Sequence, residues 1–365
     1  MKICLREAAV IVAAVSLAVG LAACGTVGGP GGNASGGDDF KIGLLFPDNQ
    51  VTRYEQFDRP LVESKIKELC ADCTVEHANA QADVATQQQQ VASMIAKKVR
   101  VLILDAVDTK AVRSAVEEAD QAGIPVVAYD RLAEGPISAY VSFDPEQVGR
   151  LQGEGLLTAL GDRAGGGQIV MMNGDPRDRA AALFKKGALS VLQGRVKIGK
   201  AYDTPGWRPE IANANMSRAI TTLGADRIDG VYAVNDGMAS GVIAALKSAK
   251  VTSLPPVTGQ DAELVAVQRI VVGDQYMSVY KPFKSEATAA AEMAVALGRG
   301  GSLDHIAKDR ISTPTTKAVP AVVLTPLSVT VNNIKDTVVK DGMYTLDQIC
   351  TPAFASACKK AGLTP

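Results

Sequence analysis

The sequence predicts an α/β fold made of two lobes, each a doubly wound parallel sheet with helices on both faces. Short runs of β-branched and other apolar residues alternate along the chain with stretches in which apolar residues recur at helical spacing. Buried strands that alternate with amphipathic helices are typical of parallel sheets with crossover helices. The chain has 365 residues, and the part after residue 40 is long enough for two such lobes.

The expected elements follow one another in order. The apolar runs predicted to form strands are residues 41–46, 74–77, 101–104, 124–129, 168–172, 230–234 and 256–258. Val91, Met94 and Ile95 lie on one face of a predicted helix between the second and third runs. The glutamines at 87–90 are expected on the solvated face of that helix.

The N-terminus indicates export. Lys2 and Arg6 precede the apolar run 8–23, which is too short and too rich in alanine to predict a membrane span. Residues 1–23 are therefore interpreted as a bacterial secretion signal. The run ends in Leu-Ala-Ala-Cys24, which resembles the lipoprotein box and implies that Cys24 is acylated and becomes the first residue. The alternative is an ordinary cleavage site with a chance cysteine.

Residues 24–39 are rich in glycine and predict a flexible tether, because such a segment cannot bury apolar surface. A tether behind an acylated Cys24 places the protein outside the cell, on the outer face of the cytoplasmic membrane. The lipid is then its one expected attachment to the membrane.

With Cys4 removed in the signal and Cys24 acylated, four cysteines remain, and an even number suits an oxidising exterior. We expect two short-range disulfides, Cys70 with Cys73 and Cys350 with Cys358, although three pairings are formally possible. A redox-active Cys70-Ala-Asp-Cys73 pair is less consistent with the sequence, because the pair closes a helical pattern instead of opening a helix after a strand. A zinc site would need a second ligand pair, and none has the right spacing.

Charge and motifs exclude several classes of function. The net charge is −1 and no basic stripe is present, so nucleic acid is not an expected partner. His77 and His305 are the two histidines, and neither stands at metal-ligand or triad spacing. The sequence carries no nucleophile elbow, phosphate-binding loop or dinucleotide fingerprint. We therefore expect no enzyme activity, no cofactor and no metal.

Polar residues follow the predicted strands directly, where a doubly wound sheet binds its ligands. They occur as Pro47-Asp48, Asp130-Arg131, Asn173-Gly174-Asp175, Asn235-Asp236 and Gly259-Gln260-Asp261. Any one of these groups is equally well explained as a turn or helix cap. Five together favour a ligand site, because capping rarely demands arginine or glutamine beside aspartate.

Carboxylates, amides and cations in one rim suit a neutral polyhydroxylated ligand, since each sugar hydroxyl both donates and accepts a hydrogen bond. The C–H face of such a ring can lie on an aromatic side chain. Trp207, the one tryptophan, stands in a loop flanked by Pro205 and Pro209, which favours a place in a cleft over core filling.

The chain from 41 to about 342 resembles the two-lobed sugar-binding proteins of bacterial ABC importers, and among them the D-xylose-binding proteins. The segments that carry the resemblance are Thr52-Arg53-Tyr54, Ala128-Tyr-Asp-Arg131, Val141-Ser-Phe-Asp144, Gly206-Trp207, Gly259-Gln-Asp-Ala262, Val279-Tyr-Lys-Pro282 and Val331-Asn-Asn-Ile-Lys-Asp336.

The resemblance implies a role for each matching residue. Tyr54 and Trp207 would sandwich a pyranose, although the family usually has tryptophan at the first position. Ala180 stands where the xylose binders usually carry asparagine, so that contact is missing or is supplied by Arg179. The implied hydroxyl contacts come from Arg53, Asp130 and Arg131 in the N-terminal lobe, from Asp178, Asn235 and Asp261 in the C-terminal lobe, and from Lys281 near the hinge.

The resemblance also implies a hinge of three crossing segments. The expected N-terminal lobe comprises 40–142 and 278–318, and the expected C-terminal lobe comprises 143–277 and 319–365. A monomer of this kind would close on a monosaccharide and deliver it to an ABC permease and its ATPase. The alternatives are a sugar-sensing subunit for a membrane sensor kinase or chemoreceptor and, less consistent with the motifs, a secreted hydrolase.

Overall fold

The computed structural model describes residues 39–364 of the chain. The expected signal 1–23, the acylation site Cys24 and all but the last residue of the expected tether lie outside the described residues. Within 39–364, no helix combines the length and the apolar character needed to cross a membrane.

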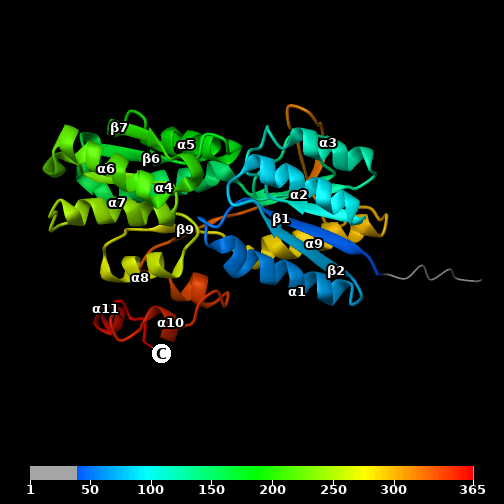
Figure 1. The fold of residues 1–365 in the computed structure, drawn as a ribbon. Coiled ribbons are helices and arrows are strands. Elements are labelled where there is room, and N and C mark those ends of the chain that lie inside the picture. Colours follow the sequence, from blue (N-terminus) through cyan, green and yellow to red (C-terminus); the bar gives the residue numbers. More distant parts are fainter. Residues whose placement is uncertain (1–38, 365) are drawn as a thin grey trace, which may run out of the picture. The chain divides into compact units, whose positions relative to one another are not determined.

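The first lobe is built on a seven-stranded sheet in the order β10-β11-β5-β4-β3-β1-β2, in which every pairing but β10 with β11 is parallel (Figure 1). Leu44 and Leu45 on the first strand face opposite sides of this sheet and enter two different apolar clusters. The strands are β1 (Lys41–Phe46), β2 (Thr74–Asn79), β3 (Val101–Leu104), β4 (Val126–Tyr129), β5 (Ala139–Phe143), β10 (Asp309–Ile311) and β11 (Val319–Leu324).

Two helices cover each face of this sheet. Helices α1 (Arg59–Leu69) and α9 (Phe283–Gly298) pack together on one side, and α2 (Val84–Ala96) and α3 (Arg113–Gln121) lie on the other (Figure 1). A π-helical turn at Tyr54–Asp58 leads into α1. Such turns are rare and are frequently found at functional sites.

The second lobe has a three-stranded parallel core in the order β7-β6-β8. Parallel bridges from Val231 to Val257 and from Gln260 to Val279 extend it to the antiparallel pair β9–β12. Its strands are β6 (Gln168–Asn173), β7 (Lys197–Asp203), β8 (Gly230–Ala233), β9 (Ser278–Tyr280) and β12 (Leu327–Val329).

Two pairs of helices pack on the second sheet. They are α4 (Pro145–Leu160) with α5 (Arg179–Leu192), and α6 (Pro209–Leu223) with α7 (Asp236–Ser248). Helices α4 and α5 approach so closely that a Cβ on Gly149 would lie 1.9 Å from the carbonyl oxygen of Phe184. This contact fixes the start of α5, which borders the cavity described below. Short helical turns occupy Gly161–Gly165, Pro205–Trp207 and Ala225–Arg227.

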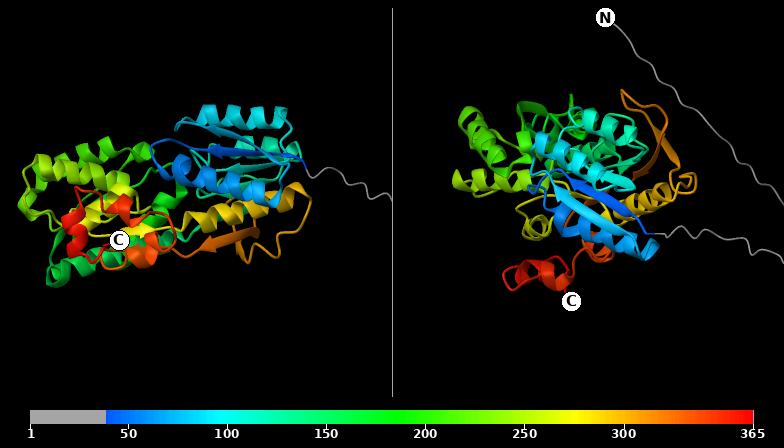
Figure 2. Two further views of the ribbon diagram at one scale, coloured as in Figure 1. Left: turned by 90° about the horizontal axis from the view of Figure 1, so that it is seen from below. Right: turned by 45° about the vertical axis from the view of Figure 1, so that its right-hand side comes forward.

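The C-terminal segment packs on α8 (Leu264–Val272). It contains a π-helical turn at Lys335–Val339, α10 (Leu346–Ile349) and α11 (Ala355–Lys360). Figure 2 shows this segment beside the second lobe. The expected disulfides are present: Cys350 pairs with Cys358 beside α11, and Cys70 pairs with Cys73 at the end of α1.

Two of the expected lobe boundaries need correction. Strand β11 was expected in the C-terminal lobe but pairs in parallel with β5, so the chain remains in the first lobe until Leu324. Strand β9 was expected in the N-terminal lobe, but Val279 bridges to Gln260 of the second sheet. The crossings therefore lie at 143–145, 281–283 and 324–327.

Candidate ligand-binding site

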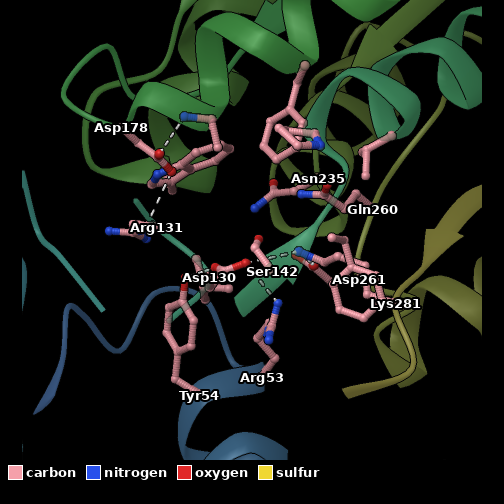
Figure 3. A pocket seen from close by; sticks show the side chains of 17 residues that line it. Arg53, Tyr54, Asp130, Arg131, Ser142, Asp178, Asn235, Gln260, Asp261 and Lys281 are labelled. Carbon is pink, nitrogen blue, oxygen red and sulfur yellow. Dashed lines mark hydrogen bonds and ion pairs between the residues drawn. The ribbon is translucent and has the colours of Figure 1, made fainter. Parts of the chain in front are cut away.

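A cavity lies between the two lobes, and residues of both lobes line it. All of the residues predicted to contact a ligand except Arg179 line it. Figure 3 labels all of these but Trp207 and shows the labelled ones converging from both lobes. They are Arg53, Tyr54, Asp130, Arg131, Asp178, Trp207, Asn235, Asp261 and Lys281.

Arg53 is buried and held by a set of acids. Its Nε and Nη2 atoms donate to the carboxylate of Asp58 at 2.7 and 3.0 Å, and Nη2 also donates to Glu286. The remaining nitrogen, Nη1, reaches Asp130 at 3.3 Å on the cavity wall. Burial raises the pKa of Glu286 to about 8 although Arg53 opposes that rise. The guanidinium is thus fixed from behind and presents one edge to the cavity.

Asp130 follows β4 and is a carboxylate of the first lobe's wall. Burial would raise its pKa, but Lys281, Arg53 and Arg131 together lower it to about 2. The hydroxyl of Tyr54 donates to its Oδ2 at 3.0 Å. Asp130 is therefore an anion that accepts hydrogen bonds throughout the physiological pH range.

Arg131 joins the two lobes electrostatically. Its guanidinium lies 2.9 Å from Asp48 and 3.7 Å from Asp105 in the first lobe, and 3.4 Å from Asp178 in the second. Thr52 adds a second contact across the cleft by donating to Glu263 at 3.3 Å. The two lobes are therefore in contact around the cavity.

The second lobe contributes polar groups from three loops. Asn235 caps α7 by accepting from the backbone of Met238 at 2.9 Å, so it is both a cap and a wall residue. Asp261 forms an ion pair with Lys281 at 2.9 Å. Burial lowers the pKa of Lys281, but Asp261 and Asp130 outweigh it and raise that pKa. Gln260 Oε1 is buried and accepts no hydrogen bond from the described residues, so it is available to a ligand donor.

Trp207 forms the aromatic wall of the second lobe. Its ring packs edge-on against Phe184 at 6.4 Å and lies over Gly174, where a Cβ would stand 2.3 Å from the indole. Its Nε1 is buried and has no hydrogen-bond partner among the described residues. Trp207 (φ 57°), Asp130 (φ 52°) and Asp261 (φ 93°) all have left-handed backbone conformations, which cluster at functional sites.

Replacing Gly174 by alanine should push the indole of Trp207 into the cavity, because the added methyl group has no other space. We expect ligand affinity to fall about 10-fold or more while the fold remains intact. Titration calorimetry of the variant beside the wild type measures this effect. Gly165→Ala is the control, because nothing lies near the Cβ that it adds. Gly194→Ala is not suitable, because Gly194 has a φ of 79°. Equal affinities in wild type and Gly174→Ala would contradict the role given to this contact.

Asp178 should make ligand affinity depend on pH. Burial raises its pKa to about 6 in spite of Arg131. Below that pH the carboxyl becomes protonated, loses its ion pair with Arg131 and accepts hydrogen bonds less well. Because the folded pKa exceeds the unfolded one, this same protonation stabilises the fold as the pH falls from about 6 to about 4.

We therefore expect affinity, measured by calorimetry between pH 7 and pH 5, to decline around pH 6 without loss of folded protein. In Asp178→Asn the profile should be flatter. Identical pH profiles for the two proteins would rule out Asp178 as the source.

Arg179 departs from the expectation. It is the first residue of α5, and the helix turns its side chain away from Asp178 into a neighbouring cavity. Conversely, Ser142, Phe143 and Gln260 line the main cavity but were not among the predicted contacts. Their signal was present, since they lie inside the Val141-Ser-Phe-Asp144 and Gly259-Gln-Asp-Ala262 segments.

Within the described part of the chain, no group of histidine, cysteine and acidic residues could hold a metal ion. His77 lies outside the cavity, 3.3 Å from Glu55, and burial lowers its pKa.

Residues 42–302 match the family described as the periplasmic binding protein domain. The chain belongs to this family. Proteins of this family bind substrates for transport and are not enzymes, and the same holds for this protein.

Curated relatives and a solved structure extend the match beyond the family domain. The D-xylose-binding periplasmic protein of Escherichia coli K12 is 38% identical over 84% of this chain and 91% of its own length. That of Haemophilus influenzae is 36% identical over 85% and 92%. A solute-binding protein of an ABC transporter from Clostridium phytofermentans, solved with bound β-D-glucose, has a TM-score of 0.78 and 30% identity, covering 85% of this chain and 99% of that one.

Proposed function

We propose that this periplasmic binding protein captures a monosaccharide, D-xylose, in the cavity between its lobes and presents it to an ABC permease. The observation that carries the proposal is the convergence of ionic side chains from both lobes on one small cavity that also holds an indole. Arg53, Asp130 and Asn235 offer donors and acceptors to neighbouring hydroxyls. The similarity to D-xylose-binding proteins supports the choice of sugar.

Closure follows from the division of the wall between the lobes. A sugar that first contacts Asp130 and Arg131 gains Asn235 and Asp261 when the lobes meet. Because the ligand makes more contacts in the closed form, it shifts the population toward that form. The contacts of Arg131 with Asp178 and of Thr52 with Glu263 then hold the cleft shut.

Delivery completes the proposed function. The closed monomer is the form that a permease with its ATPase would accept. An acyl chain on Cys24 would keep the protein on the outer face of the cytoplasmic membrane, within reach of that permease. Metabolic labelling with a fatty acid tests the anchor, and a Cys24→Ser protein that still takes up the label would contradict it.

The sugar is tested by titrating the protein without residues 1–24 with D-xylose, D-glucose, D-ribose, L-arabinose and D-galactose. Trp207 is the one tryptophan of the chain, so its fluorescence reports occupancy of this cavity. We expect a saturable change with D-xylose at the lowest concentration. Tighter binding of another of these sugars would overturn the choice of D-xylose, and no response to any, confirmed by calorimetry, would overturn the function.

A further inference from the structure

A second cavity, which is partly open to solvent, adjoins the first. Phe143, Pro145 and Ala180 line both cavities and so form the wall between them. Ala180 contributes only a methyl group to that wall. The two spaces are therefore separated at this point by the smallest side chain that carries a Cβ.

The second cavity differs in chemistry from the first. Leu132, Ile311 and Val323 line it from the first lobe, and Leu183 lines it from the second. Arg179 is its one charged residue. Val323 is 36% exposed, which makes it one of the few large apolar side chains of the described chain left open to solvent. Such walls favour an apolar group and offer little to a second sugar ring.

The second cavity also spans the cleft. Its walls come from β5, β10, β11 and the loop after β4 on one side, and from the first turns of α5 on the other. A group placed there would touch both lobes at once. Its contacts would therefore stabilise the closed form and not the open form, as those of the sugar do.

We propose that the protein also binds glycosides: a monosaccharide in the main cavity whose apolar, aryl-sized substituent passes Ala180 and lies in the second cavity. This inference rests on the proposed sugar binding and specifies its ligand further. The shared wall makes the occupant part of the sugar ligand, because Ala180 is the smallest of the three side chains that separate the two cavities and leaves the least bulk in the way of a substituent. Arg179 at its edge accommodates a polar atom at the far end of the substituent.

The test compares methyl and phenyl D-xylopyranosides, both as α and β anomers, by titration calorimetry against D-xylose. For the anomer that points toward Ala180, the phenyl glycoside should bind at least about 10-fold more tightly than the methyl glycoside, because its binding removes an aromatic ring from water. Phenyl glycosides of both anomers that bind no tighter than their methyl counterparts overturn the inference.

Two variants separate this site from the main one. In Leu183→Ser and Ile311→Ser, which change the second cavity alone, the phenyl advantage should fall at least severalfold while D-xylose affinity stays as in wild type. Unchanged D-xylose affinity also shows that each variant is folded. Val272→Ser on α8, where the side chain is 43% exposed, is the matched control and should retain the full advantage.

The outcomes distinguish the two proposals. If D-xylose binds but the phenyl glycosides do not, the result contradicts the second cavity as a subsite and leaves the proposed function intact. A phenyl advantage that persists in both serine variants also contradicts it, because the ring then lies elsewhere. Failure of D-xylose and of every glycoside contradicts the proposed function and this inference with it.

Discussion

Replacing Arg53 by methionine should lower the free energy of unfolding by about 3–5 kcal/mol, because it leaves the buried carboxylate of Asp58 without its cation. Asp58 and Glu286 are both fully buried, and Arg53 bonds to each. The same change removes a donor from the cavity, so ligand binding should be lost. Chemical denaturation followed by circular dichroism measures the stability, and calorimetry measures the affinity.

The loss of stability should shrink at acidic pH. Burial raises the pKa of Asp58, so its protonation at acidic pH neutralises the charge that the missing guanidinium leaves unpaired. Glu286, with a pKa of about 8, is already largely protonated at pH 7. Arg59→Met is the matched control: its side chain is 41% exposed and pairs with Glu55 and Glu63 at the surface, so its cost should stay within about 0.5 kcal/mol. Equal costs for the two arginines would contradict the role of the buried cluster.

Replacing Trp207 by alanine should weaken sugar binding by about 2–3 kcal/mol, or roughly 30- to 150-fold, because the apolar face of the ring loses its partner. Trp207 is buried between Gly174 and Phe184. Truncation should therefore also cost about 3 kcal/mol of stability or more through the cavity it leaves. Calorimetry is the measurement of choice, since the variant has no tryptophan left to report binding.

Trp207→Phe separates the two effects. A phenylalanine keeps an aromatic face toward the cavity, so it should recover much of the affinity. A folded Trp207→Ala protein that binds D-xylose as tightly as wild type would show that the indole is not a wall of the sugar site.

The sequence predicts the central strands well because of how a parallel sheet is buried. Strands β1 and β3 are covered on both faces, so they appear as unbroken apolar runs with sharp ends. Some of the polar residues behind the predicted strands line the cavity, among them Asp130, Arg131, Asn235 and Asp261. The family resemblance, and not position, implied the roles of Arg53, Tyr54, Asp178 and Lys281.

Strand β11 shows where local patterns carry no information. It contains Pro320, which argues against a strand in the middle of a sheet, and its partner β5 lies far earlier in the chain. Only the tertiary pairing brings the two together. For the same reason the expected lobe boundary at 318 falls several residues too early.

Side-chain direction limited the prediction of the site. The sequence does not show that Asp178 lines the main cavity while Arg179 lines the neighbouring one, because the direction of each side chain depends on the angle at which α5 starts. Gln87 was expected in solvent, yet it is buried and bonds to the backbone of Asp105 and Val107. Glu286 gave no signal at all, since an acid on a helix is normally solvated.

The pairing of β11 with β5 has a consequence for the order in which the chain acquires its structure. The C-terminal lobe's core between α4 and β9 is a continuous stretch of sequence, and every strand of its parallel sheet is present once Tyr280 has emerged. The first lobe begins earlier in the sequence, but its sheet is complete only when β11, which ends at Leu324, has been synthesised. A chain that emerges from its N-terminus onward therefore assembles the parallel core of its second lobe before the sheet of its first lobe is complete, and the edge of β5 that later pairs with β11 stays unpaired in the interval.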